Sequence, residues 1–360
     1  MAKIVTVYNS WRRRFEPVDM SYIRWLKISE ALARRGHRVD IATNELVWWL
    51  KKSLVQMNQN LRRVPLSTVK WNDYDVVKTL FHFGFDTLEA YGGKDHPFVI
   101  SKLGSVVASE DRDGIYFYGK ERERMYLTQE KINRSSSYVT VLSKPAKRLW
   151  QECFRKRSNI LVVPGGVDRD IPRPVRNPYP ADNRARCIFA GNLYGKQSQP
   201  EANSVLIGKL NRLGRLLSRR AARLYVLGSG EVRRLEKKYV CYLGAASYEE
   251  AWDYLRFADV GIVVSAGKFQ HNNESSKIYH YVRAGLPVVS EAGFPNDNVV
   301  IESRLGFLSE NGDLEQMAAK IEEAAHKDWD RDYAINYILD HHTWDKRVEV
   351  YDTLLKNHFS

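Results

Sequence analysis

The feature that most constrains the fold is a repeated alternation of short β-branched runs with amphipathic helical stretches. The first such unit is the strand KIVTVYNS, a helix from Met20 to Arg35 and the strand HRVDIAT. Apolar residues recur near helical spacing in the helix, and Gly36 stands where a helix commonly ends. A βαβ unit of this kind favours a parallel sheet with right-handed crossovers. The chain therefore begins as an α/β domain.

The alternation continues to the end of the first half. Further buried strands are predicted at residues 75–81, 97–104 and 138–143, followed by the helix KPAKRLWQECF and the strand and turn NILVVPGGVD. The segment RDIPRPVRNPYPADNR then contains four prolines and no periodicity, so we interpret it as a linker. After it the same alternation restarts and continues to a final helical segment.

This order predicts two Rossmann-like α/β domains that face each other across a cleft. The predicted domains are residues 1–168 and 169–343, with a helix at about 344–360 packing back on the first domain. A chain of 360 residues is long enough for two such cores. Because ligands bind beyond the carboxyl ends of parallel strands, the candidate functional residues are those that directly follow the strands.

Composition limits the cellular setting and the partners. The chain has no run of about 20 apolar residues, and its first residues read as a strand and not as a secretory signal. Cys153, Cys187 and Cys241 are scattered, which indicates a reducing compartment and argues against a structural metal site. We expect a cytoplasmic protein without a metal or cofactor. The net charge of +13 predicts an anionic partner without saying which one.

The second half resembles the donor-binding domain of GT-B-fold glycosyltransferases, specifically glycosyltransferase family four and its relatives. The segments that carry the resemblance are NILVVPGGVD, RCIFAGNLYGKQ, RLYVLGSGE, YLGAASYEEAWDYLRFADVGIVVS and NNESSKIYHYVRAGLPVVSE. The likeness spans most of residues 159–344. It implies a GT-B fold and the transfer of a sugar from a nucleoside-diphosphate sugar to an acceptor hydroxyl.

The last of these segments is the most specific and has a physical rationale. A helix N-terminus presents unpaired N–H groups and a positive dipole end, so it can hold a diphosphate. Ser275 and Ser276 would add hydroxyl donors and Lys277 a positive charge. The alternative is an amphipathic helix packed on a sheet, with its lysine in solvent.

The resemblance implies further donor-binding residues, with departures from the family pattern. The implied diphosphate contacts are Gly191, Asn192, Lys196, Gly228 and Gly230, although the glycine turn could equally be a tight strand-to-helix turn. His280 stands where the family usually has a glutamate that grips the ribose, so that role is either changed or moved to Glu274. The paired glutamates of retaining members are missing in register, so the stereochemistry stays open.

The first half offers candidates for acid–base chemistry. An inverting glycosyltransferase needs a general base, normally a carboxylate or a histidine. Glu110, Asp111 and Asp113 lie in a loop after a predicted strand, and His82 follows another. The alternatives are a charged surface loop and a buried, hydrogen-bonded histidine.

Two segments combine cations with aromatic residues. Trp11, Arg12, Arg13 and Arg14 follow the first strand, and Trp48 and Trp49 open the segment VWWLKKSLVQMNQNLRR. Such segments suit an anionic membrane surface or an acceptor, and the resemblance adds lipid-linked or glycan acceptors. Core tryptophans beside a solvated basic face are the alternative, and nucleic acid is not expected because no nucleic-acid motif is present.

These observations lead to one main hypothesis and two alternatives. The main hypothesis is a nucleotide-sugar-dependent glycosyltransferase, peripheral on the inner face of a membrane. The alternatives are a nucleotide-sugar epimerase, which would need no acceptor, and a basic module without enzymatic activity that binds nucleic acid or anionic lipid.

Overall fold

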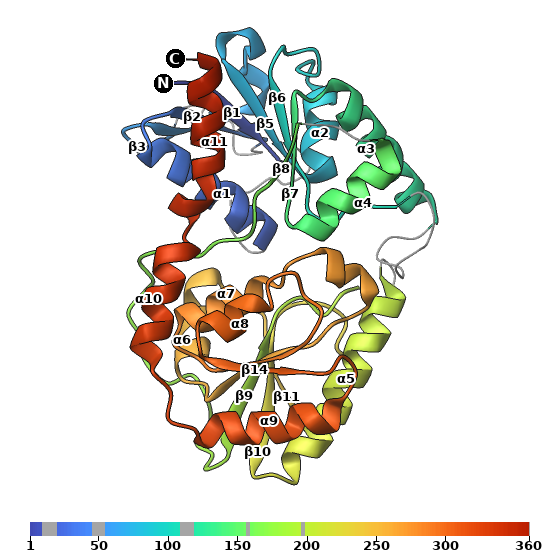
Figure 1. Cartoon of the computed structure of the whole chain (residues 1–360), viewed down its shortest axis with the longest axis vertical. Coiled ribbons are helices and arrows are strands. Elements are labelled where there is room, and N and C mark those ends of the chain that lie inside the picture. Colours follow the sequence, from blue (N-terminus) through green and yellow to red (C-terminus); the bar gives the residue numbers. More distant parts are fainter. Residues whose placement is uncertain (9–19, 45–54, 109–118, 156–158, 196–198, 360) are drawn as a thin grey trace. The chain divides into compact units, whose positions relative to one another are not determined.

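The computed structural model describes residues 1–8, 20–44, 55–108, 119–155, 159–195 and 199–359. These residues form two compact units (Figure 1). Unit 1 comprises the described residues up to Gly166 together with the segment from Trp344, and unit 2 runs from Val167 to Thr343. Unit 2 therefore stands between two described parts of unit 1 in the sequence, and unit 1 is completed only by its last helix.

Unit 1 is built on an eight-stranded sheet in the order β3-β4-β2-β1-β5-β6-β7-β8. Every neighbouring pair is parallel except β3 with β4. Its elements are β1 (Lys3–Val7), α1 (Met20–Arg34), β2 (Arg38–Thr43), β3 (Val55–Asn58), β4 (Leu61–Pro65), η1 (Leu66–Thr68), η2 (Trp71–Asp73), β5 (Val76–Leu80), α2 (Phe81–Ala90), β6 (Val99–Lys102), α3 (Gly119–Ser135), β7 (Tyr138–Val141), α4 (Lys144–Phe154), β8 (Ile160–Val162) and α11 (Trp344–Phe359).

Helices α1 and α11 cover one face of this sheet, and α2, α3 and α4 cover the other (Figure 1). Helix α11 buries Trp344, Val348, Tyr351 and Leu355 in the core beside α1. The three apolar positions after Trp344 follow helical spacing and give α11 a single apolar face, which explains why it packs on the sheet.

A group of polar contacts fixes α11 against the end of α1. Arg34 makes a two-pronged contact with Asp345, at 2.9 and 3.1 Å. The buried His37 ring contacts Asp352 through Nε2 at 3.1 Å, and Arg35 donates to the same carboxylate at 3.1 Å. Because Asp352 is buried, these hydrogen bonds offset the cost of removing its charge from water.

Unit 2 is built on a six-stranded parallel sheet in the order β11-β10-β9-β12-β13-β14. Helices α5 and α9 cover one face, and α6, α7, α8 and α10 cover the other (Figure 1). Its elements are β9 (Ala185–Ala190), α5 (Pro200–Ser218), β10 (Ala222–Leu227), β11 (Val240–Gly244), α6 (Tyr248–Arg256), β12 (Val260–Val263), η3 (Lys268–Asn272), α7 (Ser276–Arg283), β13 (Val288–Glu291), α8 (Asn298–Glu302), β14 (Gly306–Ser309), α9 (Leu314–His326) and α10 (Arg331–His341).

The structure contains elements that the sequence patterns did not predict. Strands β3 and β4 form a hairpin inside the segment that we interpreted as one amphipathic stretch. Helix α2 begins at Phe81, which adopts a left-handed φ of 55° directly after β5, so its start carries no usual helix signal. The proline-rich segment is not extended between the units, because Tyr179 is buried in unit 2 and donates to the Tyr254 carbonyl at 2.8 Å.

No helix in the described ranges is long and apolar enough to cross a membrane.

Candidate functional site

The sheet of unit 2 changes its direction of winding between β9 and β12, its two central strands. In parallel α/β sheets, ligands bind at the carboxyl ends of the strands beside such a switch point. The pairing of β9 with β12 extends over only two residue pairs, Cys187 with Val260 and Ile188 with Gly261. The Tyr281 hydroxyl accepts from the Ala190 N–H at 2.9 Å, beyond the last pair. The loops that follow β9, β10 and β12, and the start of α7, therefore define the candidate site.

Two glycines bring the loops after β9 and β10 into backbone contact. The Gly191 N–H donates to the Leu227 carbonyl at 2.8 Å. Gly228 has a φ of 145°, and a side-chain carbon on it would lie 1.9 Å from the Gly191 carbonyl oxygen. Gly230 has a φ of 136° and would place such a carbon 2.8 Å from the Leu193 side chain. Both glycines of this turn are therefore required by space and by backbone conformation.

The start of α7 is held by a neighbouring loop. Asn296, which follows β13 and is buried, accepts from the Ser275 N–H at 3.0 Å and donates to the Ser275 carbonyl at 2.9 Å. The Ser275 hydroxyl is buried and has no hydrogen-bond partner among the described residues. A buried hydroxyl without a partner is rare in a folded protein, which suggests that a ligand supplies one. The first N–H groups of α7, from Ser276 onward, lie beside it.

Lys277 is half-buried at this edge of unit 2, with its ammonium group packed against neighbouring side chains. Its Nζ is 4.7 Å from the centre of the Phe189 ring, and its side chain fills the space beside Gly191, where a side-chain carbon would lie 2.5 Å from Lys277 Cε. Burial lowers the pKa of Lys277 to about 8. Gly191, Gly228 and Lys277, which are far apart in the sequence, are therefore neighbours in space. An anion placed here would meet a desolvated ammonium group and would favour its charged form.

Glu274 and His280 occupy different surroundings. Glu274 accepts a hydrogen bond from the Tyr279 hydroxyl at 2.8 Å. His280 is buried, its Nδ1 donates to the Ser276 carbonyl at 2.7 Å, and its ring lies 5.5 Å from that of Trp252. With Nδ1 carrying the proton, neutral His280 presents Nε2 as an acceptor. Glu274 therefore precedes α7 and His280 lies within it, and each is oriented by a hydrogen bond.

The structure also shows buried polar side chains that connect the loops of this edge, which sequence reasoning missed. The fully buried Glu291 carboxylate accepts from Lys209 at 2.8 Å, from the Ser265 N–H at 2.6 Å and from the Gly312 N–H at 3.0 Å. Asn203, on α5, donates to the Leu193 carbonyl at 2.7 Å. Asn296 and Gln270 act similarly on other loops. Isolated polar residues of this kind resemble surface residues in a sequence, so no signal distinguishes them.

His82 is the candidate of unit 1 that the structure describes. It lies in α2, is buried, and packs toward Gln129 of α3. Burial lowers its pKa to about 4, so it is neutral at physiological pH. The other candidates, Glu110, Asp111, Asp113, Lys196, Trp11, Arg12, Arg13, Arg14, Trp48 and Trp49, lie outside the described residues. Their roles stay predictions from the sequence.

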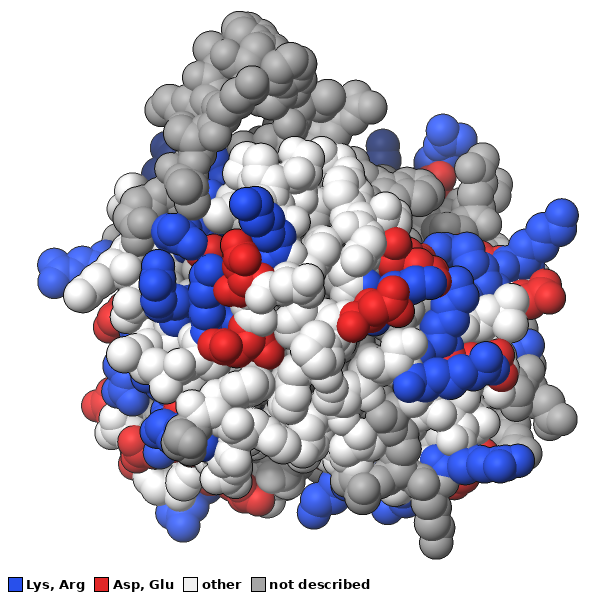
Figure 2. Space-filling model, turned by 90° about the horizontal axis from the view of Figure 1, so that it is seen from above, with Lys and Arg blue, Asp and Glu red and all other residues white. Residues whose placement is uncertain are grey.

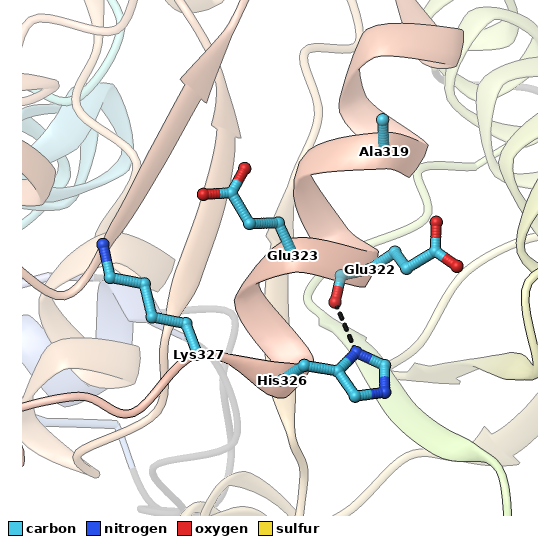
Figure 3. A pocket seen from close by; sticks show the side chains of 5 residues that line it. All are labelled: Ala319, Glu322, Glu323, His326 and Lys327. Atoms are coloured by element: carbon cyan, nitrogen blue, oxygen red, sulfur yellow. Dashed lines mark hydrogen bonds between the residues drawn. The ribbon is translucent and has the colours of Figure 1, made fainter.

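A surface hollow elsewhere in unit 2 does not have the character of a site. It lies at the end of α9 and is lined by Ala319, Glu322, Glu323, His326 and Lys327 (Figure 3). The labelled charged side chains point in different directions, and His326 is bonded to the Glu322 carbonyl of its own helix at 2.8 Å. Glu322 also pairs with Arg220, which precedes β10, so the hollow lies near the amino ends of the strands.

Residues 184–327 match the family Glycosyl transferases group 1. No curated protein sequence matches the chain. Among solved structures, the sucrose-phosphate synthase of Thermosynechococcus elongatus is 14% identical, with 99% of each chain covered and a TM-score of 0.69. Anabaena HepE, in complex with UDP and glucose, is 12% identical with a TM-score of 0.67, and covers 99% of this chain and 100% of its own.

A third solved structure is WaaG, a glycosyltransferase involved in lipopolysaccharide biosynthesis. It is 14% identical with a TM-score of 0.63, and covers 97% of this chain and 98% of its own. At these identities the likeness concerns the fold. The fold and the family match together define the protein as a glycosyltransferase with the GT-B fold, which confirms the predicted fold class and activity. Within it, residues 184–327 are the part of the chain that is similar to the group 1 glycosyl transferases.

Proposed function

We propose that unit 2 binds the diphosphate of a nucleoside-diphosphate sugar and that the protein transfers the sugar to an acceptor hydroxyl. The observation that carries the proposal is the half-buried Lys277 packed beside Gly191, together with the buried Ser275 hydroxyl at the start of α7, which has no hydrogen-bond partner among the described residues. Ser276 contributes its backbone N–H and its hydroxyl at the same helix end. Structures of Anabaena HepE with UDP and with UDP and glucose support the donor class.

The chemistry follows from the charges at this edge. Breaking the bond between the sugar and the diphosphate places negative charge on the leaving phosphate oxygen. A desolvated ammonium group and the N–H groups of a helix N-terminus stabilise that charge more strongly than water would. Gly191 and Gly228 allow the backbone to approach the phosphates closely. Glu274, just before α7, and His280, within α7, are proposed to contact the nucleoside.

The proposal is tested by calorimetric titration of the purified protein with UDP, GDP, ADP, dTDP and CMP at moderate salt. Saturable binding of one nucleoside diphosphate identifies the donor class. Turnover of the matching nucleotide sugar without an acceptor would favour the epimerase instead. If none of these nucleotides bound while anionic liposomes or single-stranded DNA did, the proposed donor site would be wrong.

Nucleotide affinity is expected to fall as the pH rises above about 8. Burial holds the pKa of unliganded Lys277 at about 8, below the usual 10.5, and a bound anion raises it again. Binding above that pH must therefore take up a proton, and the association constant should fall by up to about tenfold per pH unit. The measurement is a series of titrations with the bound nucleotide between pH 7 and 10. An affinity that did not change across this range would exclude contact with Lys277.

We further propose that unit 1 faces an anionic acceptor surface, such as a membrane that carries a lipid-linked glycan precursor. Residues 1–166 and 344–360 hold 32 Lys and Arg and 20 Asp and Glu, whereas residues 167–343 hold 24 and 23. The basic excess therefore belongs to unit 1. The exposed positions of α4 and the residue after it include Lys144, Arg148 and Arg155. The role of WaaG in lipopolysaccharide biosynthesis is consistent with such an acceptor.

The face seen in Figure 2 does not carry the charge separation that such a surface needs. There the Lys and Arg side chains alternate with Asp and Glu around an uncharged centre.

The protein is expected to cosediment with vesicles containing 30% anionic lipid and to be released as salt rises, because attraction to anionic lipid is screened. Neutral vesicles are the control. Equal binding to both kinds of vesicle would contradict an electrostatic contact.

A further inference from the structure

Tyr194 adopts an unusual backbone conformation in the loop after β9. Its φ of 61° lies in the left-handed region, which residues with a side chain rarely adopt. The conformation is locally supported, because the Tyr194 N–H donates to the Asn192 side chain at 2.9 Å. Tyr194 is almost wholly buried, and its ring belongs to the core that α5 and α9 form with the sheet. A tyrosine held in this way within a ligand-facing loop calls for an explanation beyond packing.

The backbone of Tyr194 connects its loop to the loop after β10. The Glu231 N–H donates to the Tyr194 carbonyl at 2.9 Å, and the Leu193 N–H donates to the Ser229 carbonyl at 2.8 Å. Asn203 adds a second connection between the same loops, since its side chain donates to the Leu193 carbonyl at 2.7 Å and to the Glu231 carbonyl at 3.0 Å. The loops after β9 and β10 therefore move as one body.

The side chain of Tyr194 connects the same body to the loop after β12. Its hydroxyl accepts from Gln270 Nε2 at 2.6 Å, and Gln270 Oε1 accepts from the Ala266 N–H at 2.7 Å. This hydrogen-bonded connection joins the loops where the sheet provides no pairing between β9 and β12. The pairing of β9 with β12 ends at Ile188 and Gly261, two residues before each strand ends.

We infer that Tyr194 is a positioning residue of the nucleotide site and that its hydroxyl acts through Gln270. The inference rests on the proposed function of unit 2. Gly191 lies three residues before Tyr194 and packs against the Lys277 side chain, so a loop that is free to move would displace the wall against which Lys277 lies. Holding three loops from three strands in place before the ligand arrives lowers the entropy that binding must remove.

The test separates the Tyr194 hydroxyl from its ring. Tyr194→Phe keeps the packing and removes the hydrogen bond to Gln270. The matched control is Tyr179→Phe, because Tyr179 is also buried in unit 2 and donates one hydrogen bond, to the Tyr254 carbonyl at 2.8 Å. Tyr179 lies away from these loops, near the start of β9. The guanidinium carbon of Arg186 is 5.6 Å from the centre of the Tyr179 ring. The two variants should have similar melting temperatures.

For binding, each variant is titrated with UDP, GDP, ADP and dTDP. Tyr194→Phe is expected to weaken the nucleotide that the wild type binds by five- to twentyfold, and Tyr179→Phe by less than twofold. Gln270→Met should lose at least as much affinity, because it also removes the hydrogen bond from the Ala266 N–H. The double variant Tyr194→Phe with Gln270→Met should lose no more than Gln270→Met alone, since the hydrogen bond between the two side chains is already absent there.

Hydrogen exchange of the amides at residues 191–195 provides a readout without ligand. It should be faster in Tyr194→Phe than in the wild type and unchanged in Tyr179→Phe. Unchanged affinity and exchange in Tyr194→Phe would overturn the inference while leaving the nucleotide site intact. Absence of any nucleotide binding by the wild type would instead remove the proposed function, and the positioning role with it.

Discussion

Replacing Lys277 by methionine is expected to weaken nucleoside diphosphate binding by at least about 100-fold while leaving the protein slightly more stable. The loss of affinity follows from removing a desolvated charge that faces the diphosphate, since hydrogen bonds and ion pairs to charged groups are the strong ones. The gain in stability follows from the same burial. Methionine gives up the contact between the ammonium group and the Phe189 ring, but it places no charge at this half-buried position.

The sign of the stability effect depends on pH. Unfolded Lys277 binds a proton below about 10.5, whereas burial lowers the pKa in the folded protein to about 8. The wild-type folded state is therefore penalised as the pH falls from 10.5 to 8, and the penalty stays constant below that. Lys277→Met should show its full stabilisation below pH 8 and lose it toward pH 10.5, as measured by thermal unfolding of unit 2.

Lys78 provides a matched control for this experiment. It lies in β5 of unit 1, is also buried, and has a pKa lowered to about 7 by burial and by the neighbouring Arg24. Lys78→Met should therefore raise stability in the same direction without changing nucleotide affinity. If Lys78→Met weakened binding as much as Lys277→Met, the effect would be general to the fold, and Lys277 would have no special role.

Replacing Trp344 by alanine is expected to destabilise unit 1 by about 3–5 kcal/mol, the usual cost of removing a large aromatic side chain from a core. Trp344 is 1% exposed and begins α11. Its ring packs so closely on Gly166 that a side-chain carbon there would lie 2.8 Å from it. The substitution therefore leaves a cavity where α11 enters the core.

The measurement is thermal or urea unfolding followed by a probe in each unit, because the two units need not unfold together. The transition of unit 1 should move to lower temperature, and nucleotide binding by unit 2 should persist. Val350→Ala is the control, since Val350 is on the same helix but is 37% exposed, and its cost should stay below about 0.5 kcal/mol. Equal effects of both substitutions would mean that α11 does not contribute to the core as described.

The sequence was sufficient for most of the architecture because the strands and helices of a doubly wound fold have distinct periodicities. Pattern alone could predict the β-branched strands, such as those before His37 and after Gly285. It could also predict the amphipathic helices between such strands. Helix α2 could not, because FHFGFDTLEA has aromatic residues on several sides and a glycine inside. Strand β3 lies at the sheet edge and pairs with β4, which in turn pairs with β2. Such short edge strands carry little signal in the sequence.

The candidate site shows where sequence reasoning ends. Ser275, Lys277 and the glycine turn could be named from the sequence because helix starts and glycine loops have recognisable patterns. The packing of Lys277 against Gly191 and Phe189 could not, since a lysine in the first turn of an amphipathic helix normally points to solvent. Tyr194, Gln270, Asn296 and Glu291 could not be named either, because their importance lies in contacts between distant segments.

The discontinuity of unit 1 has a consequence for how the protein is made. Its sheet is complete in the nascent chain after Val162, but α11, which covers α1 and one face of that sheet, is synthesised only after all of unit 2. During translation unit 2 can close its own core while unit 1 still exposes the apolar surface that Trp344, Tyr351 and Leu355 later cover. Domains generally fold as units from the N-terminus onward, yet here the first to begin is the last to finish. The ribosome-bound chain therefore still exposes this apolar surface when unit 2 is already complete.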